Sequence, residues 1–213
     1  MSDVHAIPRH AFFLQTDPQA GVLLLSAFGS ASTSGAPQDC QISERRLYTP
    51  RFVLKILIDS VEYKCWHEVG HATVCLHLGG DVDFIEFLDG DARGHARARC
   101  VVTSEIEKSV ACGGFAAEVY LLNKGHAEQG HDDERNISQV IFHNATGDRE
   151  DFWERKVGRD EEFTKAEDEE FMHHAIGLDG FGGVVPIFDQ YFSGMQELVR
   201  ELRDARRIEG RRV

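Results

Sequence analysis

The chain has 213 residues, and its 36 acidic and 23 basic side chains give a formal net charge of −13 at pH 7. Hydrophobic residues make up 42% of the chain, which suffices for a sizeable core and excludes a disordered tail. The negative charge repels phosphate backbones and anionic headgroups, so we expect no nucleic-acid partner.

The five cysteines include no C-x-x-C pair, so the pattern predicts neither a disulfide framework nor a cysteine-rich zinc finger. We expect reduced and mostly buried thiols. The longest apolar run, Gly21 to Phe28, covers about eight residues, whereas a bilayer span takes roughly 20. Since the first residues also lack the apolar core of a secretory signal, the sequence favours a cytoplasmic protein without a membrane span.

The pattern divides the chain into an N-terminal segment of unclear role, residues 1–48, and one domain over residues 49–213. Thr49 and Pro50 are typical of a helix start, because threonine caps the first amides and proline lacks one. They predict a first helix that runs to about Ile58.

A longer helix follows and carries the candidate chemistry. Asp59 or Ser60 is expected to cap its start, and Gly79-Gly80 ends it. The short apolar alternation of Val82 to Leu88 then predicts a strand, with Arg97 to Thr103 as its antiparallel neighbour.

The rest of the domain is predicted to be helical. Gly113-Gly114 interrupts the first of these helices, and we expect a close helix crossing there, because glycine otherwise destabilises a helix. The expected segments are a helix over Ser104–Asn123, a helix from Asp132 or Asp133 to Asn144, a solvated acidic helical face over Asp148–Glu170 and a terminal amphipathic helix over Pro186–Arg207. The fold class is therefore mainly α with a small β element.

The long helix contains an H-E-x-x-H motif, formed by His67, Glu68 and His71. Residues four apart lie on one helix face, so both histidines can direct a ring nitrogen at one metal ion, and Glu68 can act as a base beside it. An ordinary amphipathic helix is the alternative. Because the same face continues into Val74 and Leu78, however, unpaired imidazoles would lie against the core at a cost.

Three sequence blocks occur in an order that resembles a known family. The motif helix, His67–Leu78, is HEVGHATVCLHL, a later segment, Val110–Val119, is VACGGFAAEV, and Asp132-Asp133-Glu134 follow a glycine-containing loop. Together they resemble the peptidase domain of the FtsH-type ATP-dependent zinc metalloproteases, with Val69 in place of the usual alanine. The resemblance covers roughly Ser60–Asn144 and implies a helical zincin-like fold that binds one Zn²⁺ ion.

The resemblance also implies a third zinc ligand, an aspartate that leads the helix after the loop. In the family, apolar residues follow this aspartate four and seven positions later. Asp133 fits that pattern through Ile137 and Val140, and we predict it as the ligand that joins the two motif histidines. Asp132 and Glu134 remain alternatives, because loop lengths vary freely.

Glu118 follows two alanines at a position where the family has an acid that does not bind the metal. We therefore expect Glu118 to support the site through helix packing or a hydrogen bond to a ligand. The string Phe115-Ala116-Ala117-Glu118 also resembles the regulatory zinc peptidases that cleave phage-type repressors. The ligand acid that those proteins place before the phenylalanine is missing here.

Family members join this domain to an ATPase and to membrane helices, and they assemble as hexamers. This sequence has no G-x-x-x-x-G-K-[ST] phosphate loop. The resemblance therefore implies a stand-alone domain that cleaves short or unfolded peptides or works with a separate ATPase, and that forms a homo-oligomer.

The sequence thus predicts a zinc metalloendopeptidase in which Glu68 is the general base. We also expect the strand Val82–Leu88 to hold an extended substrate at its edge, with Phe84 and Phe87 in contact. The alternative is a zinc-stabilised binding or regulatory module without catalysis. A chance motif in a structural protein is the remaining hypothesis.

Overall fold

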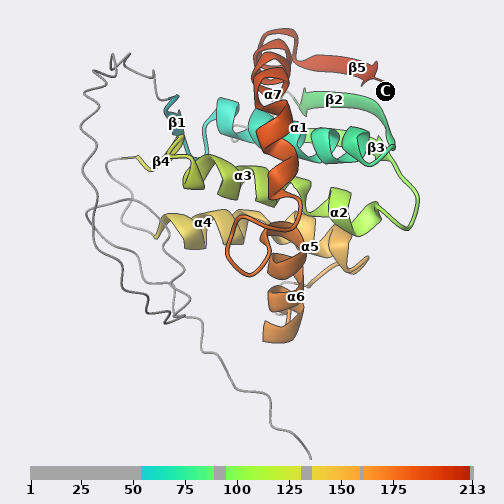
Figure 1. The fold of residues 1–213 in the computed structure, drawn as a ribbon, viewed down its shortest axis with the longest axis vertical. Helices are drawn as coiled ribbons and strands as arrows, with labels where there is room; N and C mark the ends of the chain where they lie inside the picture. Colours follow the sequence, from blue (N-terminus) through green and yellow to red (C-terminus); the bar gives the residue numbers. More distant parts are fainter. Residues whose placement is uncertain (1–53, 89–94, 131–135, 159–160, 212–213) are drawn as a thin grey trace, which may run out of the picture. The chain divides into compact units, whose positions relative to one another are not determined.

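The computed structural model describes residues 54–88, 95–130, 136–158 and 161–211. Within these ranges the chain is mainly helical with two small β-sheets, which confirms the predicted fold class at that level (Figure 1). The helices are α1 (Val61–His77), α2 (Glu107–Ala111), α3 (Gly113–Asn123), α4 (Ile137–Asn144), α5 (Thr146–Phe152), α6 (Lys165–Ile176) and α7 (Val185–Ala205). The strands are β1 (Ile56–Leu57), β2 (Asp81–Leu88), β3 (His95–Val101), β4 (Ala127–Glu128) and β5 (Arg207–Arg211). The predicted N-terminal segment lies outside the described residues.

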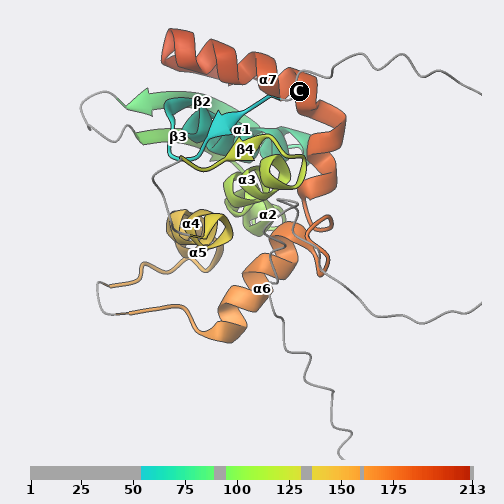
Figure 2. The same cartoon turned by 90° about the vertical axis from the view of Figure 1, so that its left-hand side faces the viewer.

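Helix α1 packs against α3 on one side and against α7 and the larger sheet on the other (Figure 2). It begins as predicted, because the Ser60 hydroxyl accepts a hydrogen bond from Tyr63 N at 3.1 Å. It ends before Gly79, whose φ of 85° is a left-handed conformation that glycine adopts without strain. Among the described helices, none has both the length and the apolar character that a bilayer crossing requires.

Helices α1 and α3 approach each other through glycines. A Cβ atom added to Gly70 would lie 2.6 Å from Ala117 Cβ and 2.6 Å from Gly113 O. One added to Gly113 would lie 2.9 Å from His71 Cα. The predicted close crossing at the glycine pair is therefore confirmed. The predicted single helix is divided into α2 and α3 at Cys112, the residue immediately before Gly113.

The larger sheet has the strand order β3-β2-β5, and both neighbours of β2 are antiparallel to it. Ile85 of β2 lies opposite Ala98 on one side and Ile208 on the other. The hairpin of β2 and β3 confirms the sequence prediction, whereas β5 was not predicted. Because β5 occupies its second edge, the hypothesis that the strand Val82–Leu88 holds a substrate at an edge is wrong.

The predicted first helix is also wrong over its described part. Ile56 N donates to His126 O at 2.8 Å and Ile58 N donates to Glu128 O at 2.9 Å, so this segment pairs in parallel with β4. Both residues are β-branched and fit a strand. The helix-start residues Thr49 and Pro50 lie outside the described residues.

The acidic stretch after residue 148 does not form a uniformly solvated face. Asp148 and Phe152 of α5 are only 6% and 2% exposed, and Phe171 of α6 is fully buried. The helices α5 and α6 therefore pack one face against the core, and Asp148 is on that face.

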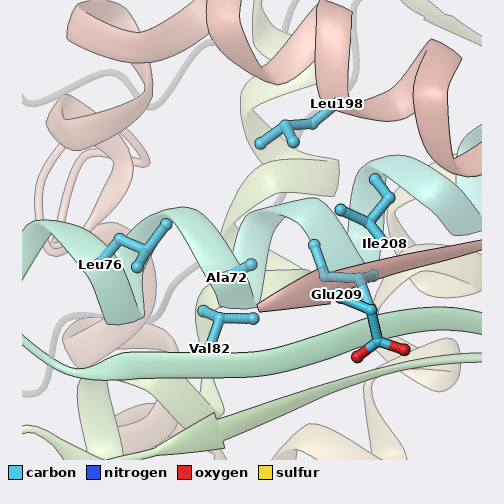
Figure 3. A pocket seen from close by; sticks show the side chains of 7 residues that line it. Ala72, Leu76, Val82, Leu198, Ile208 and Glu209 are labelled. Carbon is cyan, nitrogen blue, oxygen red and sulfur yellow. The ribbon is translucent and has the colours of Figure 1, made fainter. Parts of the chain in front are cut away.

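An apolar depression lies between α1, α7 and the sheet (Figure 3). Its lining is made by Ala72, Leu76, Val82, Ile85, Leu198, Ile208 and Glu209. Glu209 is the one charged residue of that lining, so the depression has no set of side chains suited to a metal ion.

Candidate metal centre

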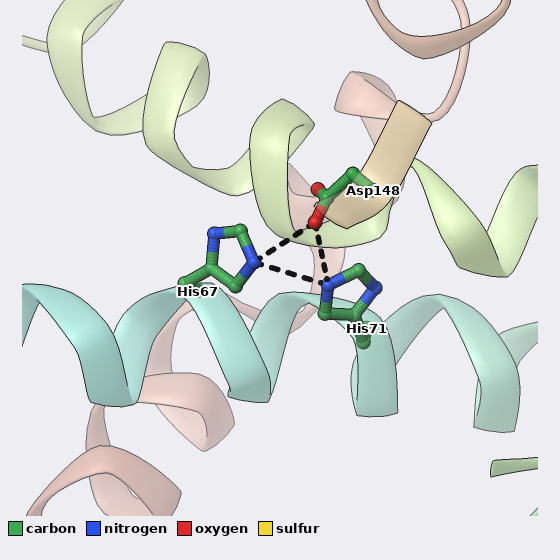
Figure 4. Close-up of side chains that lie close together, drawn as sticks. All are labelled: His67, His71 and Asp148. Carbon is green, nitrogen blue, oxygen red and sulfur yellow. Dashed lines mark hydrogen bonds and ion pairs between the residues drawn. The ribbon is translucent and has the colours of Figure 1, made fainter. Parts of the chain in front are cut away.

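The two motif histidines meet an acid from a distant helix. Helix α1 places His67 and His71 one turn apart, with 3.2 Å between their Nε2 atoms. Asp148 Oδ1 lies 3.1 Å from His67 Nε2 and 3.5 Å from His71 Nε2. Figure 4 shows the three side chains converging between α1 and α5.

The partners of the far ring nitrogens fix how both rings are protonated. His71 Nδ1 donates to Val110 O at 2.7 Å, and His67 Nδ1 donates to Glu118 Oε1 at 2.8 Å. A carbonyl and a carboxylate only accept, so each Nδ1 carries hydrogen and each neutral ring presents an Nε2 lone pair. Two lone pairs and a carboxylate oxygen at these distances repel one another unless a proton or a metal ion lies among them.

The spacing of the three atoms fits a tetrahedral metal ion. Ligand bonds of about 2.05 Å separate any two corners of a tetrahedron by roughly 3.3 Å. The observed separations are 3.1, 3.2 and 3.5 Å. The side chains of His67 and His71 are 17% and 16% exposed, so the two rings are not fully enclosed by the protein.

The charges in the group favour a bound cation. Burial alone would raise the pKa of Asp148, but His67 and His71 outweigh it and lower that pKa well below its usual range. Burial alone would lower the pKa of both histidines, but Asp148 raises them, and Glu118 raises that of His67 further. The group therefore holds positive charge strongly, whether as protons or as a metal ion.

Asp148 is held in place by α3. Its Oδ2 accepts a hydrogen bond from Phe115 N at 2.8 Å, while Oδ1 faces the histidines. Phe115 lies in the first turn of α3, where an N–H group has no partner within its own helix. The carboxylate thus satisfies that N–H and points its second oxygen at the site.

Glu118 supports the site in the way that the sequence predicted. It is 3% exposed and contacts the Nδ1 side of His67, opposite the nitrogen that faces Asp148. Burial raises the pKa of Glu118, although the adjacent His67 opposes this effect. Such an acid fixes the tautomer of a metal-binding histidine and raises its basicity.

Gly114 leaves the space in which the two imidazoles converge. A Cβ atom at this position would lie 2.4 Å from His67 Nε2 and 2.5 Å from His71 Nε2. No side chain fits there without displacing both rings. Gly114 is therefore required by the site, whereas Gly113 is required by the close crossing of α1 and α3.

Glu68 lies next to the group on α1 and contacts the sheet. Its Oε2 accepts a hydrogen bond from Ala98 N at 2.7 Å. Since this N–H points to Glu68, it does not pair with β2, and the edge of β3 that faces away from β2 borders the site.

The structure brings together His67 and His71 as the motif predicted, whereas the one printed contact of the Glu68 carboxylate is with Ala98 N of β3. Asp133, the third ligand predicted from the sequence, and its alternatives Asp132 and Glu134 lie outside the described residues, so the structure does not test them; among the described residues the acid beside the two histidines is Asp148. Asp148 was not recognised as a candidate ligand.

One signal in the sequence could have identified Asp148. It shares a helix face with Ala145 and Phe152, which are 0% and 2% exposed, because residues three and four apart lie on the same side of a helix. An acid within an apolar stripe indicates a buried partner. The neighbouring Glu150 and Asp151 concealed this pattern.

Comparison with models of protein families gives no match for this chain, and no curated protein matches it.

Proposed function

We propose that the protein is a zinc-dependent metallopeptidase with His67, His71 and Asp148 as its metal ligands. The observation that carries the proposal is the tetrahedral spacing of these three atoms, with Glu68 on the same helix. The sequence resemblance to FtsH-type peptidase domains supports a peptide bond as the target. A zinc ion bound there would lower the pKa of a bound water molecule and polarise the scissile carbonyl.

Glu68 acts as the general base in this proposal. Its Oε2 is held by Ala98 N, so Oε1 takes the proton from the attacking water and then delivers it to the leaving amine. The hydrogen bond restricts the carboxylate to one orientation. A base held in this way loses little entropy when the substrate binds.

The substrate is an extended peptide or an unfolded protein segment that pairs with the outer edge of β3. β3 is the terminal strand in the order β3-β2-β5, and its Ala98 N–H is taken by Glu68, so the substrate pairs with the other outward-facing backbone groups of this edge. Backbone pairing of this kind depends little on the substrate sequence. A separate ATPase could supply unfolded chains to the site.

The contact of Glu68 with Ala98 also suits a second function. If the carboxylate serves only to hold β3 against α1, the metal stabilises a binding or regulatory module without turnover. Glu68 is then a structural residue.

Glu68→Gln distinguishes the two functions. The amide keeps the size of the side chain and cannot act as a base, so peptidase activity on unfolded casein should fall by about 10²-fold or more while zinc content stays at one ion per chain. Glu62→Gln, on the same helix and 33% exposed, is the matched control and should keep full activity. Zinc-loaded wild type without measurable cleavage would favour the binding module.

A further inference from the structure

Two arginines lie two residues apart on the solvent face of β3. Arg97 lies opposite Glu86 of β2, and Arg99 lies opposite Phe84. Ile85, between these two β2 residues, is 3% exposed, so the opposite face of the sheet is the one that packs against the core. The side chains of Arg97 and Arg99 are 58% and 66% exposed. Strand β3 therefore presents two positive charges to solvent on one face.

The backbone groups of β3 alternate between β2 and the outer edge. Ala98 N donates to Glu68 Oε2 at 2.7 Å, so the backbone of Ala98 points away from β2. Because this direction alternates along a strand, the backbone groups of Arg97 and Arg99 point at β2. On the outer edge these two residues therefore occupy non-hydrogen-bonded positions. At such positions the side chains of an added strand come closest to those of β3.

Each of the two arginines already has an acidic neighbour on β2. Arg97 Nε donates to Glu86 Oε1 at 2.6 Å, and Glu86 also contacts Arg207 of β5. Arg99 Nε lies 3.2 Å from Asp83 Oδ2. A guanidinium has five N–H donors, and a bidentate carboxylate takes two of them. Both arginines can therefore bind a second carboxylate from the side of the outer edge.

We propose that the outer edge of β3 selects extended peptides with acidic residues at two alternating positions, one opposite Arg97 and one opposite Arg99. The residue between the two acids lies opposite Ala98, and its side chain points to the face that packs against α1, the helix of Glu68. The preferred substrate thus contains an acid-x-acid sequence. The inference rests on the proposed peptidase function for the cleavage step, whereas the selection depends only on the edge and its charges.

The charge of the whole chain restricts this preference to the two positions. The net charge of −13 repels acidic peptides in general. Attraction by Arg97 and Arg99 acts over short distances, because salt screens exposed charges beyond about 10 Å. Two adjacent acids cannot both face the arginines, since successive side chains of a strand point to opposite faces. The spacing of the acids, and not their number, therefore determines the selection.

Four fluorogenic peptides of otherwise equal sequence test the preference on the zinc-loaded full chain. They contain Glu-Ala-Glu, Gln-Ala-Gln, Lys-Ala-Lys or the rearranged Glu-Glu-Ala. We expect kcat/KM for Glu-Ala-Glu to exceed that for each other peptide about fivefold at low salt, because two exposed cross-strand ion pairs contribute modestly. In about 1 M NaCl the ratio should fall toward one.

Substitution of the arginines tests their role directly. Arg97→Gln combined with Arg99→Gln should bring kcat/KM for Glu-Ala-Glu down to that for Gln-Ala-Gln, and cleavage of Gln-Ala-Gln should stay unchanged. Arg207→Gln is the matched control. Arg207 contacts the same Glu86, but β5 lies on the far side of β2 from the outer edge of β3. The control variant should keep the fivefold preference.

Binding of the same peptides, measured by fluorescence anisotropy, separates this proposal from the proposed function. A lower Kd for Glu-Ala-Glu without cleavage of any peptide would support the selection by β3 and contradict the peptidase function. Equal kcat/KM and equal Kd for all four peptides would overturn the selection and leave the peptidase function intact. Arg97 and Arg99 would then only keep the edge of β3 from pairing with other chains. Absence of both binding and cleavage would contradict both proposals.

Discussion

Asp148 Oδ2 accepts a hydrogen bond from Phe115 N at 2.8 Å, and this contact aims the other carboxylate oxygen at the two histidines of α1. The acid thus connects the start of α3 with the motif helix. Its position depends on three helices and not on its neighbours in the sequence.

Gly114→Ala should abolish metal binding. The added Cβ would lie 2.4 Å from His67 Nε2, so the two imidazoles must move apart. Their Nε2 atoms then no longer point at one metal position. Elemental analysis should find zinc in wild type and less than about a tenth of it in the variant.

Gly147→Ala is the matched control for that substitution. Gly147 is in α5, next to Asp148, and an added Cβ meets no atom within 4 Å. Alanine should stabilise this helix by up to about 1 kcal/mol and leave the zinc content unchanged. Equal zinc content in both variants would show that Gly114 does not border the site.

Glu118→Gln should weaken metal binding without abolishing it. The amide can still contact His67 Nδ1, but it lacks the negative charge that raises the basicity of the ring. We expect the zinc dissociation constant to rise about 10- to 100-fold in competition with a chelator. An unchanged constant would reduce Glu118 to a packing residue.

Ala98→Pro should lower peptidase activity and spare the metal. Proline removes the N–H that holds Glu68 Oε2, and it is tolerated at that position because this N–H points away from β2. We expect kcat to fall about tenfold with zinc content unchanged. Ala96→Pro, two residues earlier on the same strand and also partly exposed, is the control for damage to the strand itself.

The stability of the metal-free protein should depend on pH in a defined direction. The folded-state pKa values of His67 and His71 are raised, so the charged histidines stabilise the fold fully below their ordinary value of 6.5. This contribution is lost as the pH rises through the raised values. Denaturant melts of chelator-treated protein should therefore show stability falling from about pH 6.5 upward.

The contribution of Asp148 to the stability of the folded protein has the opposite pH dependence to that of the histidines. Its pKa is lowered by the two histidines, so its stabilising charge is present above the ordinary value of 3.8 and is lost as the pH falls through the lowered one.

Zinc replaces the protons on His67 and His71, so the zinc-loaded protein should not lose stability above pH 6.5. Identical pH profiles with and without zinc would contradict the assigned ligand set.

The sequence revealed the features that depend on local spacing. Residues His67 and His71 are four apart, so their shared helix face follows from helix geometry alone. The cap at Ser60 and the glycines of the helix crossing were equally local signals.

The features that depend on distant contacts were not recognised. Asp148 lies 81 residues after His67, and its burial results from the packing of α5 against α2 and α3. Ile56 forms a strand because β4 provides a partner, and β5 exists because β2 has a second edge. No local propensity specifies these pairings.

The proposed metal centre depends on Asp148 being the third ligand. Zinc content should be measured for wild type, Asp148→Asn, Asp133→Asn and Asp151→Asn, the last being a 70% exposed aspartate of the same helix as Asp148. We predict about one zinc ion per chain in wild type, in Asp133→Asn and in Asp151→Asn, and a loss of most of it in Asp148→Asn. Full zinc content in Asp148→Asn, with zinc lost in Asp133→Asn, would show that Asp133 and not Asp148 is the third ligand.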